Sequence, residues 1–131
     1  MHIAHVSNEQ ALYFLKRHKA NKEQISITSC ELWYAMVEDN PSITPIITGV
    51  LGIVFMRSSI RIKCLFVSPI DRKRGIATQL LEKALEGRKD KVFSAYATVR
   101  SKPLFEKYGF EVKSTRASNN VSYMVKVKEA Q

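Results

Sequence analysis

A run of basic residues at the start of an amphipathic helix constrains the fold of this chain more than any other feature. Residues 72–74 (Arg-Lys-Arg) come directly before residues 76–85, where apolar side chains recur at helical spacing. A helix N-terminus already carries unpaired N–H groups and partial positive charge, so added cations are unfavourable there unless an anion binds. Gly75 and Ala77 lack side-chain bulk, which lets the backbone approach such an anion closely. The sequence predicts a phosphate site at a strand-to-helix junction; the alternative is a solvated basic turn.

The segment before this helix alternates in the manner of a strand, over residues 60–67. One face carries Ile60, Ile62, Cys64 and Phe66, and the other carries Arg61, Lys63, Leu65 and Val67. Because Cys64 shares its face with large apolar residues, we expect it to be a buried small hydrophobic residue and not a nucleophile. In the preceding strand, predicted at residues 46–57, Gly49 and Gly52 indicate a bulge or a close backbone approach.

The remaining segments predict further strands and two more helices. Ser7 and Gln10 have the spacing of a capping box that begins one helix, and residues 101–108 predict a second, short one. Further strands are expected at residues 31–39, 92–97, 110–115 and 121–127, with a first strand around His2 and His5. Turns are expected at Asn40-Pro41-Ser42 and Ser118-Asn119-Asn120, and residues 21–29 are expected to be mostly connection. The chain is therefore expected to form one α/β domain, residues 1–131, with a mixed sheet.

Composition excludes several classes of protein. A chain of 131 residues with 45% hydrophobic and 25% charged residues can bury a core, which argues against disorder and against a disulfide scaffold. Its apolar runs fall short of the roughly 20 residues of a membrane span, and its first residues lack the features of a secretory signal. Cys30, Cys64 and the three histidines show no metal-ligand spacing. We expect a cytoplasmic protein without a metal.

The net charge of +9 and the pI of about 9.7 favour anionic partners. Nucleic acid is one candidate, although the basic residues are spread along the chain and match no known nucleic-acid motif. A basic surface also disfavours polycationic acceptors. Small molecules and neutral or acidic proteins are therefore the expected partners, and a homodimer is left open.

Two motifs resemble those of one enzyme family. The sequence Arg72-Lys73-Arg74-Gly75-Ile76-Ala77 fits the R/Q-x-x-G-x-G/A signature of the GNAT acyltransferase superfamily. Downstream, residues 98–110 (TVRSKPLFEKYGF) resemble the family pattern N-x-x-A-x-x-F-Y-E-K-x-G-F. The two motifs occur in the family's order and separation, and the predicted strands around them are compatible with it over almost the whole chain.

The resemblance implies an α/β (α+β) fold: a mixed, mostly antiparallel sheet of about six or seven strands with flanking helices, the fourth and fifth strands splayed. It implies acetyl-CoA or another acyl-CoA as the donor, with pyrophosphate on backbone amides from Arg72 to Thr78 and the pantetheine arm along the strand at Leu65, Phe66 and Val67. A backbone N–H near Phe66 or Val67 would polarise the thioester carbonyl. The implied cofactor-binding residues are Leu65, Phe66, Val67, Arg72, Lys73, Arg74, Gly75, Ile76, Ala77, Thr78, Thr98 and Lys107.

The chain departs from the family where an acid or base is expected. Phe105 stands at the position of the usual tyrosine acid and cannot donate a proton, and Lys63 stands where many relatives have glutamate. Tyr108 is one candidate acid that remains, with a packed aromatic residue as the alternative, and Tyr96 is another. The carboxylates that could reach a bound amine are Glu31, Glu38 and Asp39, of which Glu38 is preferred; the alternative is a solvent-facing strand residue.

Three functions are consistent with these observations. The first is an N-acetyltransferase in which a primary amine attacks acetyl-CoA directly in a ternary complex. The second is an acyl-CoA-binding or regulatory module of the same fold, which the missing tyrosine and glutamate favour. The third is a basic nucleic-acid-associated protein.

Overall fold

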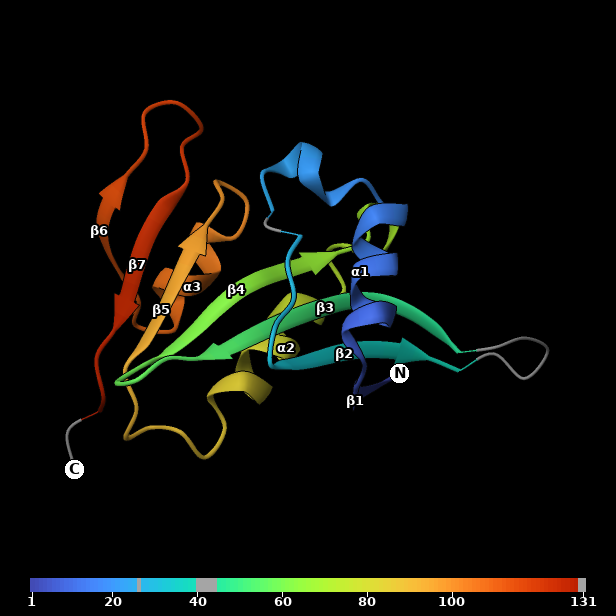
Figure 1. The fold of residues 1–131 in the computed structure, drawn as a ribbon, viewed down its shortest axis with the longest axis horizontal. Helices are drawn as coiled ribbons and strands as arrows, with labels where there is room; N and C mark the ends of the chain where they lie inside the picture. The colour runs from blue at the N-terminus through green and yellow to red at the C-terminus, as the bar shows by residue number, and fades with distance from the viewer. Residues whose placement is uncertain (26, 40–44, 130–131) are drawn as a thin grey trace.

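The computed structural model describes residues 1–25, 27–39 and 45–129, which form a sheet with helices on both faces (Figure 1). Its strands are β1 (His2–His5), β2 (Leu32–Glu38), β3 (Ile46–Phe55), β4 (Ile60–Val67), β5 (Phe93–Ala97), β6 (Glu111–Thr115) and β7 (Ser122–Lys126). Its helices are α1 (Asn8–Arg17), α2 (Ile76–Leu85) and α3 (Lys102–Lys107), with short 3-10 helices η1 (Ala20–Glu23) and η2 (Pro69–Asp71). The turn predicted at Asn40-Pro41-Ser42 lies outside the described residues.

The described strands follow the order β1-β2-β3-β4-β5-β7-β6. Only β4 and β5 pair in parallel among them, and α2 lies in the crossover that parallel neighbours require. The other described pairs are antiparallel. The prediction of a mixed, mostly antiparallel sheet with flanking helices is confirmed.

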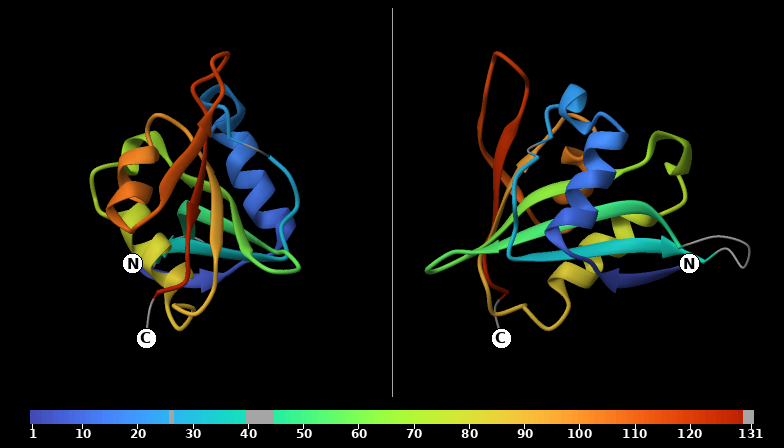
Figure 2. Two further views of the ribbon diagram at one scale, coloured as in Figure 1. Left: turned by 90° about the vertical axis from the view of Figure 1, so that its left-hand side faces the viewer. Right: turned by 45° about the vertical axis from the view of Figure 1, so that its right-hand side comes forward.

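Helices cover both faces of the sheet (Figure 2), and each face has its own apolar core. Helices α2 and α3 cover one face, where Leu80, Leu81 and Phe105 are buried. Helix α1 covers the other face through Phe14 and Leu15. This helix begins with the predicted capping box, in which the Gln10 amide donates to Ser7 Oγ over 3.1 Å and the Ser7 amide donates to Gln10 Oε1 over 3.0 Å.

Both glycines of β3, Gly49 and Gly52, lie beside β-bulges, as predicted, and both pack closely against core side chains. The pairing register shifts next to each of them, between Met36 and Val37 in β2 and between Gly52 and Ile53 in β3. A Cβ atom on Gly49 would lie 2.8 Å from Ile76 Cγ2, and one on Gly52 would lie 2.6 Å from Cys30 Sγ. Larger residues at either position would therefore force neighbouring core side chains apart.

The second bulge corrects the expected faces of β4. Gly52 pairs with Cys64 and Ile53 pairs with Ile62, so Lys63 is the extra residue in β4. An extra residue reverses the alternation of side chains. Consequently Cys64 and Phe66 pack in the α1 core, opposite Ile60 and Ile62, with which Cys64 was expected to share a face. Cys64 is nevertheless buried, as predicted.

Candidate active site

The loop between β4 and α2 presents the backbone amides of a helix start. Lys73 and Gly75 both adopt left-handed backbone conformations, with φ of 68° and 77°. Gly75 is the N-cap of α2, and no side chain caps this end of the helix. Because an α-helix leaves its first amides without intrahelical partners, the first turn of α2 offers donors to a ligand.

These amides border a cavity of about 320 Å³ between the loop, β4 and the start of α3. Ten of the twelve residues implied for cofactor binding line it: Leu65, Phe66, Val67, Arg72, Lys73, Gly75, Ile76, Ala77, Thr78 and Thr98. The fold thus brings together residues from both sequence motifs. The other two lie outside the lining: Arg74 is turned towards carboxylates, and Lys107 lies 6.0 Å from the ring centre of Tyr108.

The two arginines of the loop are already paired with carboxylates. Arg72 donates to both oxygens of Glu23 over 2.9 Å and to the Val67 carbonyl over 3.1 Å. Arg74 pairs with Glu38 and, over 2.9 Å, with Asp71. These hydrogen bonds, the one that Arg74 donates to Glu38 first, raise the pKa of Arg74 above its ordinary value. The backbone amides and Lys73 are therefore the donors that the loop leaves open to an anion.

Strands β4 and β5 separate where the bulge begins. Their pairing runs from Ile60 with Phe93 to Ile62 with Ala95, and no described pair joins them beyond that point. This is the splay that the family resemblance implied. A second cavity, of about 390 Å³, opens there and shares Ile25, Leu65 and Ser101 with the first. The two cavities are thus contiguous along the edge of β4 that is not paired with β5.

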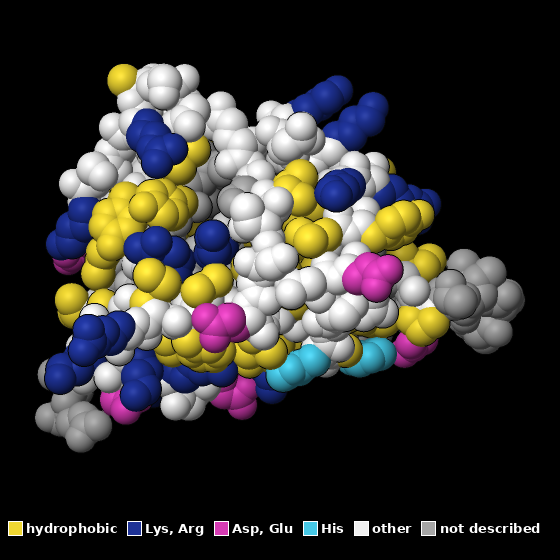
Figure 3. Space-filling model, in the orientation of Figure 1, with side chains coloured by type: hydrophobic (Ala, Val, Ile, Leu, Met, Phe, Trp, Pro, Cys, Tyr) yellow, Lys and Arg dark blue, Asp and Glu magenta, His cyan; other side chains and the backbone are white. Residues whose placement is uncertain are grey.

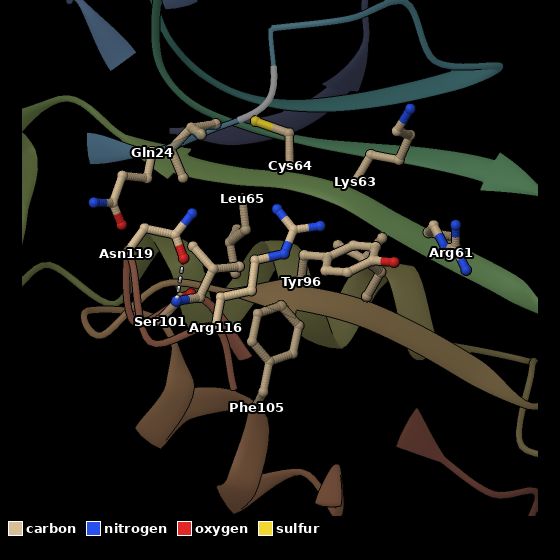
Figure 4. A pocket seen from close by; sticks show the side chains of 13 residues that line it. Gln24, Arg61, Lys63, Cys64, Leu65, Tyr96, Ser101, Phe105, Arg116 and Asn119 are labelled. Atoms are coloured by element: carbon tan, nitrogen blue, oxygen red, sulfur yellow. Dashed lines mark hydrogen bonds between the residues drawn. The ribbon is translucent and has the colours of Figure 1, made fainter. Parts of the chain in front are cut away.

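Tyr96 stands between two arginines in this second cavity (Figure 4). The Arg61 guanidinium lies 5.4 Å from the centre of its ring and the Arg116 guanidinium 5.8 Å, on opposite sides in the view. Lys63 projects from β4 away from the tyrosine. In Figure 3 the surface is hollowed between the β6–β7 hairpin and the segment that carries η1, and Lys and Arg side chains border this hollow.

The other aromatic candidates lie elsewhere or carry no proton. Phe105 is 2% exposed and lines the second cavity, where its ring packs 5.0 Å from that of Phe110. Tyr108 borders neither of the two cavities; it lines a third one, with Glu82. Partial burial, followed by the nearby Glu82 carboxylate, raises the pKa of the Tyr108 hydroxyl. Tyr96 is the candidate acid that the fold places beside the β4–β5 opening.

The candidate carboxylates are all engaged away from both cavities. Glu38 pairs with Arg74, and Asp39 lies 3.3 Å from Nδ1 of His2. Glu31 accepts a hydrogen bond from the Phe55 amide over 3.2 Å. None of the three is among the described residues that line either cavity.

The cysteine thiols of the site region are unsuited to nucleophilic catalysis. Burial raises the pKa of the Cys30 thiol to about 11, and burial together with nearby Cys30 raises that of Cys64 further. A nucleophilic cysteine reacts as its thiolate, which such values disfavour. Cys64 lines the second cavity as an apolar residue.

Several residues of the site were missed by sequence reasoning. Residues 21–29 were expected to be mostly connection, yet Glu23, Gln24 and Ile25 form a wall of the cavities. Arg116 and Asn119 reach the second cavity from the hairpin between β6 and β7. These segments lack a local motif, and only the twist of the sheet brings them near β4. The available signals were the polar run after α1 and the turn predicted at Ser118-Asn119-Asn120, neither of which indicates a site.

The chain matches the family described as acetyltransferase (GNAT) domain over residues 3–128. The chain belongs to the GNAT family. The match spans both sequence motifs and all seven described strands apart from the first residue of β1. A comparison with curated proteins gives no match.

Solved structures show that the GNAT fold extends over the chain. An acyl-CoA N-acyltransferase from Pseudomonas aeruginosa aligns with a TM-score of 0.71 and 14% identity, covering 96% of this chain and 99% of that one. A GNAT-family acetyltransferase from Staphylococcus aureus gives 0.68 and 13%, covering 98% and 100%. N-acetylglutamate synthase from Neisseria gonorrhoeae, complexed with coenzyme A and N-acetyl-glutamate, gives 0.71 and 14%, covering 99% of this chain and 36% of its own. Among the described residues, no helix has the length and apolarity to cross a membrane.

Proposed function

We propose that this GNAT protein is an N-acyltransferase that transfers an acyl group, acetyl in the first instance, from acyl-CoA to a primary amine. The observation that carries the proposal is the continuity of two cavities. One is built on the uncapped start of α2, and the other opens where β4 and β5 separate. A site that joins an anion-binding helix start to an open strand edge suits a long, phosphate-bearing donor that meets its acceptor at the far end.

The loop residues fit the phosphates of coenzyme A. Backbone amides from Gly75 to Thr78 would donate to the pyrophosphate, and the left-handed conformations of Lys73 and Gly75 turn the loop backbone around that position. Lys73 lines the same cavity, so its ammonium adds a charge that the loop arginines, held by carboxylates, do not supply. The bound donor supplies an activated thioester to the amine.

The end of β4 would bind the pantetheine arm and polarise the carbonyl. Beyond Ile62 this strand has no described pairing with β5, so its edge can hydrogen-bond an extended ligand as a strand would. A backbone N–H near Phe66 or Val67 is our proposed donor to the carbonyl oxygen, which gains negative charge as the amine attacks. Leu65 lies in both cavities and would mark their junction.

The departing thiolate needs little help, because an ordinary thiol has a pKa of about 8.5. We propose Tyr96 as the proton donor to it, since the tyrosine lines the cavity at the β4–β5 opening and 42% of its surface is exposed. No carboxylate is present among the described residues that line this cavity, so the amine would lose its proton to solvent. Positioning and the oxyanion contact would then supply most of the rate enhancement.

The test has two stages. Calorimetric titration with acetyl-CoA should give saturable binding that weakens as salt rises, because salt screens the attraction of the phosphates to Lys73 and to the positive end of α2. Release of free coenzyme A should then depend on an added amine from a broad panel. Absence of acetyl-CoA binding would refute the proposal. Binding without turnover of any amine would instead favour an acyl-CoA-binding module. The presence of Phe105 in the cavity is consistent with such a module, because its side chain cannot donate a proton.

A further inference from the structure

We infer that the acceptor amine also carries an anionic group, and that Arg61 and Arg116 bind it; amino carboxylates are the representative class. This inference rests on the proposed function, since it assigns a substrate class to the same site. The two guanidiniums flank Tyr96 in the cavity that adjoins the cofactor cavity, on the side where an acceptor would enter (Figure 4).

The first argument is that these two cations lack anionic partners. Neither Arg61 nor Arg116 forms an ion pair with a carboxylate of the described residues. Both lie within 6 Å of one tyrosine ring, where their like charges repel. The described residues lining the cavity include no Asp or Glu that could offset this repulsion. A bound anion would remove it.

The second argument is that the arginines are held in position before any ligand arrives. Arg61 Nε donates to Ser94 Oγ over 3.2 Å, which leaves its other nitrogens for a ligand. The Tyr96 ring packs 5.2 Å from the Tyr123 ring, so the surface on which the guanidiniums rest is itself supported by β7. Guanidinium groups held on aromatic faces favour recognition of planar carboxylates through paired hydrogen bonds.

The third argument concerns the amine proton. Attack requires the neutral amine, and the described lining provides no carboxylate base. Nearby cations lower the pKa of an ammonium group, because like charges disfavour its protonated form. Two guanidiniums facing one carboxylate keep a net positive charge beside the bound acceptor, which would favour loss of the amine's proton. A polycationic acceptor would gain no such contact and would be repelled.

The experiment compares Arg116→Gln with a control on the same hairpin. Arg116 is exposed, so its replacement should leave the fold intact, which the thermal unfolding midpoint verifies. Lys113→Gln removes the same charge from β6, at a residue outside the cavity lining. Coenzyme A release is measured with matched acceptors: amino carboxylates, the corresponding aminophosphonates, the neutral amino acid amides, and polyamines. Arg61→Gln and Arg116→Lys complete the set.

We expect kcat/KM to be at least about tenfold higher for the best anionic amine than for its amide, because the neutral amide cannot form charge-assisted hydrogen bonds with the arginines. Arg116→Gln and Arg61→Gln should each erase most of this preference by raising KM, Arg116→Lys should erase part of it, and Lys113→Gln should preserve it. A preference for aminophosphonates over amino carboxylates would support an anionic acceptor and identify the phosphonate as its preferred anionic group. In each variant the Kd for acetyl-CoA should stay within about twofold of the parent.

Three results would overturn the inference while leaving the transferase proposal intact: equal turnover of carboxylates and amides, faster turnover of polyamines, or equal effects of Arg116→Gln and Lys113→Gln. Weaker acetyl-CoA binding in the arginine variants would also overturn it, because these residues would then hold the donor. Failure of the proposed function has a different signature, since the parent protein would bind no acetyl-CoA or turn over no amine.

Discussion

Two basic regions adjoin in this molecule, and their arginines differ in what they contact. In the β4–α2 loop, Arg72 is held by Glu23 and Arg74 by Glu38 and Asp71. In the neighbouring cavity, Arg61 and Arg116 have only an aromatic ring and a serine hydroxyl as partners among the described side chains. The region with the denser run of basic residues in the sequence is therefore the more nearly neutralised one in the fold.

This difference separates two ways of binding an anion. A cation already paired with a carboxylate adds little attraction for an anionic ligand. Backbone amides must therefore supply most of the hydrogen bonds to an anion in the loop. An unpaired guanidinium gains most of its electrostatic energy only when the ligand arrives, which favours its use in recognition. We assign backbone binding to the donor phosphates and side-chain binding to the acceptor on this basis.

The sharpest test of backbone binding is Gly75→Val. At φ 77° a β-branched residue is strained, and its side chain would be added at a residue that lines the cavity. We expect acetyl-CoA binding to weaken about 100-fold, since several charge-assisted amide contacts are lost together. The measurement is the calorimetric Kd.

Gly87→Val is a matched control for that substitution. Gly87 follows the other end of α2 at φ 71°, and a Cβ atom there meets nothing within 4 Å, much as at Gly75. Both variants should lose a similar amount of stability, about 1–2 kcal/mol. Equal loss of acetyl-CoA binding in the two variants would show that strain, and not the loss of amide contacts, is responsible.

The sequence predicts the uncapped start of α2 and its small residues because these signals are local; that coenzyme A binds there stays a prediction. The signals lie within one short segment: a strand, a helix start without a capping side chain, and two small residues. The open backbone amides of residues 72–78 can therefore be inferred from local backbone chemistry. The positions of most strands likewise follow from alternation and turn signals, whereas their order in the sheet does not. The bulge in β4 is indicated by Gly52 on its neighbour, although its effect on the faces of Cys64 and Phe66 is not.

The second cavity, to which we assign the acceptor, depends on contacts between distant segments. Arg61, Tyr96 and Arg116 come from β4, β5 and the last hairpin, and they meet only because β7 inserts between β5 and β6. Ion pairs pose the same difficulty: Glu23 and Arg72 are 49 residues apart in the chain. Sequence reasoning counted the loop arginines as open to phosphate because it could not place these carboxylates.

A second prediction concerns the residue between the two free arginines. Tyr96→Phe keeps the aromatic ring that the guanidiniums contact and removes only the hydroxyl. If that hydroxyl protonates the departing thiolate, kcat should fall about tenfold while the Kd for acetyl-CoA stays unchanged. The fall is modest because a thiolate leaves readily even without a proton donor. Steady-state coenzyme A release at saturating amine measures this effect.

Tyr108→Phe and Glu38→Gln are the companion variants. Tyr108 lines another cavity, and Glu38 pairs with Arg74 on a partly exposed edge, so each should change kcat less than about twofold. Loss of that partly exposed ion pair should leave the thermal unfolding midpoint nearly unchanged. A larger fall in kcat for either variant than for Tyr96→Phe would move the acid–base role away from the cavity between the arginines.

The smallest expected effect has the opposite sign. Glu23→Gln removes a carboxylate from the cofactor cavity and frees both Arg72 and Arg100, which it now holds at 2.9 and 3.4 Å. Acetyl-CoA should bind about three- to tenfold more tightly, because the pyrophosphate then meets two free guanidiniums and no competing negative charge; the gain should shrink as salt rises.

Glu111→Gln, on the distant β6, should leave the Kd unchanged. Weaker binding in Glu23→Gln would instead mean that the Glu23–Arg72 pair holds η1 in the position that the donor needs, and the loop arginines would then serve the site through their pairing.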